Sequence, residues 1–243
     1  MKLLFLDTET TNLKDDRLIQ LACGSKKNPH DVLNIHCSYF RPPEPIDFEA
    51  MAVHHITNEM VLDKPYFSES ELKKDLENMR VDHVFIAHNA PFDLAVLARE
   101  GISFPLWIDT KRVAMHLFDS KSYRLQFLRY SLSLNVEGMA HDAAGDVAVL
   151  EKLFSYLYRL VEQRLQNSDF EAIINHMMAL SVNPVLMKEI PFGKHKGKTF
   201  EEIAQYHRDY LTWLWNETMK KSDEEKKNDE DLIYTLKFYL NHA

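Results

Sequence analysis

Two acidic residues, Asp7 and Glu9, stand at the end of the first apolar run of the chain. Residues 2–6 form an almost unbroken hydrophobic segment of strand length, as in a central strand covered on both faces. Alternation along the strand places both carboxylates on one face, with α-carbons roughly 6.5 Å apart. Such a pair can bracket a metal ion. A bound cation would also explain two carboxylates on one face of an apolar strand, because a carboxylate buried without a partner is costly. The alternative, that the strand has emerged into solvent by Asp7, explains this segment equally well.

A third carboxylate, Asp93, follows the sequence His-Asn-Ala-Pro-Phe at residues 88–92. Asn89 or Ala90 can cap a helix there, and Pro91 is tolerated in a first turn. Asp93 would then lie in that first turn, where the helix dipole favours a negative charge whether or not a metal binds. Taken alone, this motif favours a structural role for Asp93.

The segment His-Asp-Ala-Ala-Gly-Asp at residues 141–146 leads into a long helix. Asp146 falls on the apolar stripe of that helix, where packing alone would select a hydrophobic residue, so a metal or cationic partner is the better explanation. Asp142 is better interpreted as an N-cap. His141, on the preceding loop, can fold back toward Asp146, although a lone histidine in that place is usually structural.

The combination of these motifs, in this order, resembles the three signature motifs of the DEDD exonucleases. The segments 6–13, 88–93 and 141–146 resemble those of the DnaQ-like branch, DEDDh, which has histidine in its third motif. Residues 50–60 resemble the His-x-Ile-Thr stretch of the same branch. Asn12 stands where the family usually has glycine, but asparagine accepts left-handed backbone angles, so we expect the turn to survive.

The resemblance implies a 3′–5′ exonuclease that uses two Mg²⁺ ions, which Mn²⁺ can replace, and carboxylates are suitable ligands for such hard cations. It implies that Asp7 bridges both ions, that Glu9 and Asp146 complete the first site, and that Asp93 supports the second through water. His141 is then the general base, since free histidine has a pKa of about 6.5 and can accept a proton near neutrality. The residues expected to contact substrate are Thr8, Thr10, Leu13, His54, Asn89, Phe92, Lys194, Lys196 and Lys198.

The elements that must position these residues alternate as in an α/β domain. The predicted strands are 2–6, 17–24, 32–40, 84–87 and 106–108. The predicted helices lie near 68–79, 91–99, 111–118, 124–134 and 143–160. Three strands in succession suggest an antiparallel meander. The resemblance implies a ribonuclease H-like fold, a mixed five-stranded sheet flanked by helices, with a small, mainly helical C-terminal region.

The expected domains are an exonuclease domain at 1–168, a linker with a helix at 169–190, and the C-terminal region at 191–243. Two prolines interrupt the segment before this last region. Capping-box spacing predicts that helices begin just after Thr199 and Ser222.

The C-terminal region opens with a basic, glycine-rich turn, Pro-Phe-Gly-Lys-His-Lys-Gly-Lys, at residues 191–198. Together with Tyr-Leu-Thr-Trp-Leu at 210–214 it resembles the tail of a DNA-degrading member of the family. A P-loop is excluded, because three residues separate the glycines where that loop needs four. The turn, with Trp213 and Trp215, suggests phosphate contact and base stacking. A solvated turn beside tryptophans that pack a small core is the alternative.

The composition is that of an ordinary globular protein, with 45% hydrophobic and 27% charged residues. A net charge of −8 argues against a protein that coats nucleic acid nonspecifically, although metal-binding carboxylates add to that count. Cys23 and Cys37 are too few for a disulfide framework and are interpreted as reduced thiols. Without a signal peptide or a run long enough to cross a bilayer, the expected location is cytoplasmic.

The expected function is the removal of nucleotides from DNA 3′ ends, single- or double-stranded, in DNA repair or recombination. An exoribonuclease of the same fold is one alternative, since the sequence does not reveal whether a 2′-hydroxyl is accepted. A noncatalytic, polymerase-associated nucleic-acid-binding subunit is a second alternative, which the intact set of acidic residues opposes.

Overall fold

The computed structural model describes residues 1–12, 17–136 and 143–241. The chain divides into two compact units, Met1–Ser181 and Val182–Ala243. The predicted domain assignment stays a prediction. Ile173, Ile174 and Met177, which fall in the expected linker, are buried in the core of the first unit.

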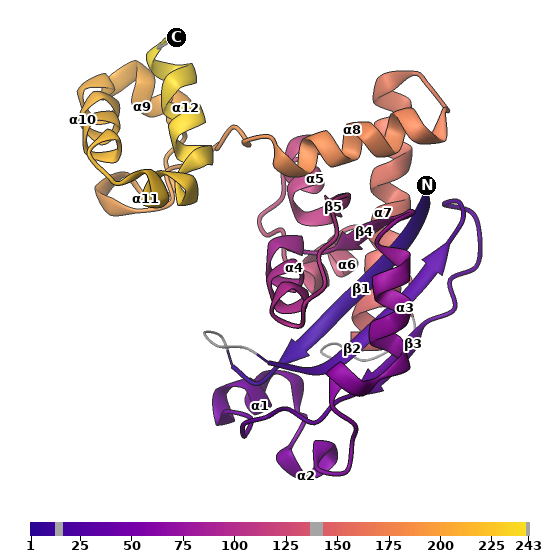
Figure 1. The fold of residues 1–243 in the computed structure, drawn as a ribbon. Helices are drawn as coiled ribbons and strands as arrows, with labels where there is room; N and C mark the ends of the chain where they lie inside the picture. The colour runs from indigo at the N-terminus through magenta and orange to yellow at the C-terminus, as the bar shows by residue number, and fades with distance from the viewer. Residues whose placement is uncertain (13–16, 137–142, 242–243) are drawn as a thin grey trace. The chain divides into compact units, whose positions relative to one another are not determined.

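A mixed sheet lies at the centre of the first unit (Figure 1). Its strands are β1 (Lys2–Thr10), β2 (Leu18–Lys26), β3 (His36–Tyr39), β4 (His83–Ala87) and β5 (Trp107–Asp109), in the order β3-β2-β1-β4-β5. The strands β1, β2 and β3 form the expected antiparallel meander, and β4 and β5 add in parallel beside β1. The predicted five-stranded mixed sheet is therefore confirmed.

The helices of the first unit flank this sheet (Figure 1). They are α1 (Phe48–His54), α2 (Asn58–Val61), the 3-10 turn η1 (Phe67–Glu69), α3 (Glu71–Met79), α4 (Ala90–Arg99), α5 (Thr110–Leu117), α6 (Leu125–Ser131), α7 (Ala143–Leu165) and α8 (Phe170–Val182). None of the helices in the described parts of the chain is long and apolar enough to cross a membrane.

Strand β1 separates two hydrophobic cores. Leu3 and Phe5 pack in the core that α7 completes, and Leu4 and Leu6 pack in the core that α3 and α4 complete. Side chains alternate along a strand, so the odd-numbered residues of β1 face α7 and the even-numbered residues face α4. The strand continues to Thr10, beyond the predicted apolar run, and its pairing with β2 shifts register between Glu9 and Thr10. The two faces therefore extend into the acidic end of the strand.

The third strand is shorter than predicted. The expected strand at 32–40 has β-structure only at His36–Tyr39, and Val32 is 82% exposed. Leu33 and Ile35 precede the strand, and both pack against the core that α7 completes. Hydrophobicity alone therefore overestimated the length of this edge strand.

The second unit is built from short helices. They are the 3-10 turn η2 (Gly193–His195), α9 (Phe200–Tyr206), α10 (Arg208–Met219), α11 (Asp223–Asn228) and α12 (Glu230–Leu240). Thr199 and Ser222 cap α9 and α11 as predicted, each accepting a hydrogen bond from the backbone N–H three residues later. The core of this unit comprises Ile190, Phe200, Ile203, Leu211, Leu214, Leu232, Leu236 and Leu240.

Candidate active site

Three carboxylates meet at the end of β1. One oxygen atom each of Asp7, Glu9 and Asp146 lies within 4.8 Å of the other two. Asp7 and Glu9 continue the face of β1 that packs against α7, and Asp146 lies in the first turn of that helix. The strand and the helix thus bring together residues from distant parts of the sequence. Asp7 and Glu9 are both half-buried, so the strand has not fully emerged into solvent at these residues.

This donor set fits a divalent metal ion. Like charges this close raise each other's cost of ionisation, so the group disfavours its own charged state unless a cation compensates. Carboxylate oxygens are the ligands that Mg²⁺ and Mn²⁺ prefer, and the group offers no thiolate that would select a softer metal.

Gln126 holds one of these carboxylates from outside the group. Its side-chain amide donates a hydrogen bond from Nε2 to Oδ1 of Asp146. Arg129, one turn later on α6, donates from its guanidinium to Oε1 of Gln126 at 3.3 Å. The sequence pattern predicts the helix, but nothing local distinguishes Gln126 from a glutamine on a solvated face.

Asp93 lies on the other side of β1, in the first turn of α4. Its side chain is buried, and Oδ1 accepts hydrogen bonds from the backbone N–H of Thr8 at 3.1 Å and from the Thr8 hydroxyl at 2.8 Å. Burial raises the pKa of Asp93 to about 7, with a further contribution from Asp109, although both bonds from Thr8 favour ionisation. Within the described residues, Asp93 is not part of the group of three carboxylates. Its role as a fourth ligand stays a prediction.

The start of α4 is held by β5 and the residues after it. Asn89 adopts left-handed backbone angles, with φ 73°, and its N–H donates to Oδ1 of Asp109 at 2.9 Å. The Asn89 side-chain oxygen accepts from Nζ of Lys111 at 3.1 Å, so Asn89 occupies the capping position without capping the helix through its side chain. The predicted contact of Asn89 with substrate stays a prediction.

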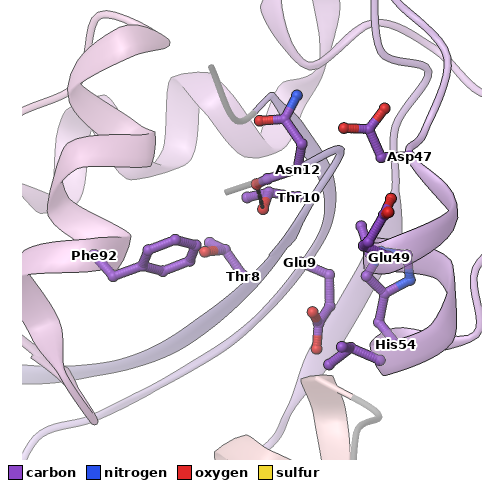
Figure 2. Close-up of a pocket in the computed structure, with 10 residues that line it drawn as sticks. Thr8, Glu9, Thr10, Asn12, Asp47, Glu49, His54 and Phe92 are labelled. Atoms are coloured by element: carbon purple, nitrogen blue, oxygen red, sulfur yellow. Dashed lines mark hydrogen bonds between the residues drawn. The ribbon is translucent and has the colours of Figure 1, made fainter. Parts of the chain in front are cut away.

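A pocket of about 510 Å³ adjoins the acidic end of β1 (Figure 2). Phe92 lies on one side of it and Glu49 and His54 on the other, with Glu9 between them in Figure 2. Its lining comprises Thr8, Glu9, Thr10, Asn12, Asp47, Glu49, Ala50, Val53, His54 and Phe92. Glu9 therefore belongs to both the carboxylate group and the pocket. Asp47, the N-cap residue of α1, and Glu49, in its first turn, were not predicted as site residues, because nothing in the local sequence distinguishes them.

His54 presents an unsatisfied nitrogen in this lining. The ring is 6% exposed, and Nδ1 accepts a hydrogen bond from the N–H of Ile56 at 3.0 Å. Nε2 is buried and makes no hydrogen bond of good geometry among the residues that the structure describes. Burial lowers the pKa of His54, which favours the neutral ring, although the Thr10 backbone acts on the ring in the opposite sense and raises its pKa. Since buried polar atoms are normally paired, a ligand atom in the pocket is a natural partner for Nε2.

The remaining predicted site residues fall in the second unit or outside the described residues. His141 and Leu13 fall outside the described residues, so their roles stay predictions. Lys194 and Lys196 are exposed in the second unit, and Lys198 forms an ion pair with Glu202 at 3.0 Å.

The segment that carries the four acidic residues matches a known family. Residues 4–154 match the family described as Exonuclease. The chain belongs to this exonuclease family. Residues 190–217 match the family described as Exodeoxyribonuclease X-like C-terminal, so the expected likeness of the tail is also confirmed.

Relatives of this exonuclease cover most or all of the chain. Exodeoxyribonuclease 10 of Escherichia coli (strain K12) is 30% identical over 249 aligned positions, which cover 99% of this chain and 100% of that protein. The DNA polymerase III subunit epsilon of Rickettsia conorii is 30% identical over 226 positions, which cover 86% of this chain and 94% of that protein.

Solved structures of exonucleases have the same fold. A structure of exonuclease X in complex with 5′ overhanging duplex DNA superimposes with a TM-score of 0.59 and 26% identity, covering 74% of this chain and 99% of that one. The nuclease domain of 3′hExo, a DEDDh family member bound to rAMP, has a TM-score of 0.53 at 14% identity and covers 65% of this chain and 92% of that one. The expected ribonuclease H-like fold class is confirmed.

Proposed function

We propose that this exonuclease hydrolyses phosphodiester bonds at the 3′ ends of DNA, with two Mg²⁺ ions held by Asp7, Glu9, Asp93 and Asp146. The convergence of Asp7, Glu9 and Asp146 beside a pocket carries the proposal, because this arrangement offers hard oxygen ligands next to room for a nucleotide. The similarity over its full length to exodeoxyribonuclease 10 supports DNA as the substrate.

The pocket is suited to the terminal nucleoside. Phe92 and Val53 supply apolar surface for a base, and Nε2 of His54 is available to bond to a sugar or base atom. Asp47 and Glu49 make this pocket unfavourable for a phosphate, because like charges repel there. The scissile phosphate therefore belongs at the carboxylate group, where bound cations would offset its charge. Leu13, Thr8, Thr10 and Asn89 stay proposed substrate contacts.

His141 is the proposed general base, which takes a proton from the attacking water. When bound, the two cations supply a polarised water and compensation for the charge of the leaving oxygen. His141 must be neutral to accept a proton, so activity should rise with pH as the imidazolium deprotonates. The variant His141→Ala is expected to bind Mn²⁺ and DNA but to lose nearly all turnover. Normal turnover of this variant contradicts the assignment.

Digestion of 3′-labelled DNA and RNA strands of the same sequence tests the proposed function. With Mg²⁺ we expect mononucleotides to be released from the DNA, and Asp146→Asn to reduce their release by at least about 100-fold, as when a charge-stabilising group is removed. Asp223→Asn is the control, because Asp223 is 99% exposed.

Each alternative has its own result in this assay. Faster degradation of RNA than of DNA favours the exoribonuclease, and no release from either strand favours a noncatalytic subunit. Comparing 3′ and 5′ labels gives the direction of digestion. Three further points stay predictions: a role in DNA repair, a cytoplasmic location, and substrate binding by Lys194, Lys196 and Lys198.

A further inference from the structure

Four aromatic rings form a row in the second unit. The ring centroids are 5.0 Å apart between His207 and His195, 4.5 Å between His195 and Tyr210, and 5.5 Å between Tyr210 and Trp213. His207, Tyr210 and Trp213 stand three residues apart along the start of α10, so they share one face of the helix. His195 joins this row from the basic turn.

Trp213 ends the row in solvent. It is 54% exposed, whereas Leu211 and Leu214 on the opposite face of α10 are buried in the core. Trp215, the other tryptophan that the sequence suggested for stacking, packs against that core. The two tryptophans therefore differ in what they can contact, and Trp213 is the one of the pair with an open ring surface.

The basic turn lies against this row. Gly193 has a φ of 70°, and a Cβ atom at this residue would come within 3.4 Å of the Tyr210 hydroxyl. The N–H of Gly197, which has a φ of 83°, donates to the carbonyl of Ile190 at 2.9 Å and closes the turn. The turn therefore packs against the Tyr210 side chain.

The turn presents two lysines to solvent. Lys194 and Lys196 flank His195 in the sequence, are exposed, and form no ion pair with a carboxylate of the described residues. Lys198 is engaged by Glu202, and Asp209 is the acidic group whose charge reaches His195. The turn itself carries no acid, so its free charges are positive.

His195 lacks the partners that a buried imidazole requires. It is 6% exposed, and neither Nδ1 nor Nε2 has a hydrogen-bond partner within the described part of the chain. Leaving polar atoms buried and unpaired is costly, so the two His195 nitrogens point to a ligand that supplies the missing hydrogen bonds. A phosphate or a base edge that displaces one of the side chains covering the ring can supply a donor or an acceptor.

We propose that this face of the second unit, comprising Lys194, His195, Lys196, His207, Tyr210 and Trp213, binds single-stranded DNA. Bases stack on the open rings, above all on Trp213, and the two lysines contact phosphates. Stacking requires an unpaired base, which a duplex does not offer along its length. The proposal deepens the proposed function and rests on it, in that the strand held here would be a substrate of the exonuclease site.

The test uses a closed circular oligothymidylate and the full chain. A circle has no 3′ end, so the exonuclease site cannot degrade it and binding is measured independently of turnover. We expect the circle to quench tryptophan fluorescence. Trp213→Ala should weaken binding about 5- to 150-fold, as expected for the loss of one base stack. Trp213→Phe should keep most of the affinity and lose most of the quenching.

The lysines are tested by the salt dependence of the same binding. Replacing both Lys194 and Lys196 by alanine should lower the slope of log affinity against log salt by about 1.4, since each phosphate contact on a single strand contributes about 0.7. Phe238→Ala and Lys227→Ala are the matched controls, because both residues are exposed in the same unit outside this face. Melting curves of all variants should coincide.

Several results overturn the proposal: no binding of the circle, equal effects of Trp213→Ala and Phe238→Ala, or equally tight binding of a closed duplex dumbbell.

Asp146→Asn separates this proposal from the proposed function. Normal binding of the circle by this variant, with an active parent enzyme, supports both. Binding of the circle by a parent that degrades no linear strand refutes only the exonuclease proposal, and digestion without binding of the circle refutes only this one.

Discussion

Thr8 holds Asp93 by two hydrogen bonds to the same oxygen atom, one from its backbone N–H at 3.1 Å and one from its hydroxyl at 2.8 Å. Thr8 lies between Asp7 and Glu9 in β1, but its side chain faces α4 while theirs face α7. The strand therefore holds Asp93 of α4 through Thr8, while its own carboxylates lie beside Asp146 of α7. We infer that the position of Asp93 relative to the carboxylate group depends on Thr8.

Thr8→Val tests this dependence. Valine has nearly the same shape but cannot donate, so Asp93 keeps only the backbone bond and becomes free to shift. We expect a 10- to 100-fold loss of activity or metal affinity, roughly the effect of removing an outer partner of a metal ligand. Thr235→Val is the control, since Thr235 is also buried and hydrogen-bonded but lies in the second unit. Full activity of Thr8→Val counts against the inference.

Gln126→Leu tests the bond to Asp146. The hydrogen bond orients the carboxylate and occupies one lone pair, and its loss should weaken Mn²⁺ binding by about 10- to 100-fold. Gln126→Glu should not restore the bond, because an ionised carboxylate cannot donate a hydrogen bond to Asp146. Calorimetric titration with Mn²⁺ measures both effects without turnover. Gln163→Leu on the exposed surface of α7 is the control, and equal affinities of the three variants and the parent rule out a positioning role.

Removal of metal should destabilise the fold. Ions that bind only the folded chain raise its stability by about 2.7 kcal/mol at a concentration 100 times the dissociation constant. The melting midpoint should therefore rise from EDTA to Mg²⁺. Asp7→Asn should reduce this rise and, in EDTA, should raise the midpoint, since it removes repulsion among the three carboxylates. An unchanged midpoint in the parent protein speaks against a preformed metal centre.

A buried ion pair should make the fold sensitive to acid. Nζ of Lys26 lies 2.5 Å from Oε1 of Glu151, and the side chains are 1% and 11% exposed. Burial opposes ionisation of Glu151, but the hydrogen bond and charge of Lys26, with a contribution from Lys152, lower its pKa below the ordinary 4.5. Because the folded-state pKa is the lower one, the stabilisation is complete above 4.5 and disappears as pH falls through the folded-state value. Urea unfolding of the parent and Glu151→Gln should converge in that acidic window.

The same pair predicts a strongly nonadditive double variant. Glu151→Leu leaves the Lys26 charge buried without a carboxylate partner. Among the described residues Nζ then keeps the carbonyl of Pro29 at 3.0 Å and the Phe5 ring at 5.6 Å, and the substitution should cost about 3–5 kcal/mol. Adding Lys26→Met removes the stranded charge and should restore most of this loss. Additive effects in urea unfolding at neutral pH would show that the two side chains do not act as a pair.

Local patterns in the sequence determined most of the elements and indicated several of the candidate site residues. The apolar run before Asp7, the cap before α4, and the capping boxes at Thr199 and Ser222 involve neighbours within one or two turns, so they can be recognised from the sequence. The resemblance of three motifs in order then indicated an exonuclease, and the family match confirmed it.

Only the tertiary structure decided which of these residues meet. It brought Asp146 to Asp7 and Glu9, placed Asp93 against Thr8, and added Gln126, which had no sequence signal. It also distinguished Trp213, open to solvent, from Trp215, packed on the core two residues later. The physical reason is that periodicity records which face a residue lies on, whereas its contacts depend on what distant segments pack against that face.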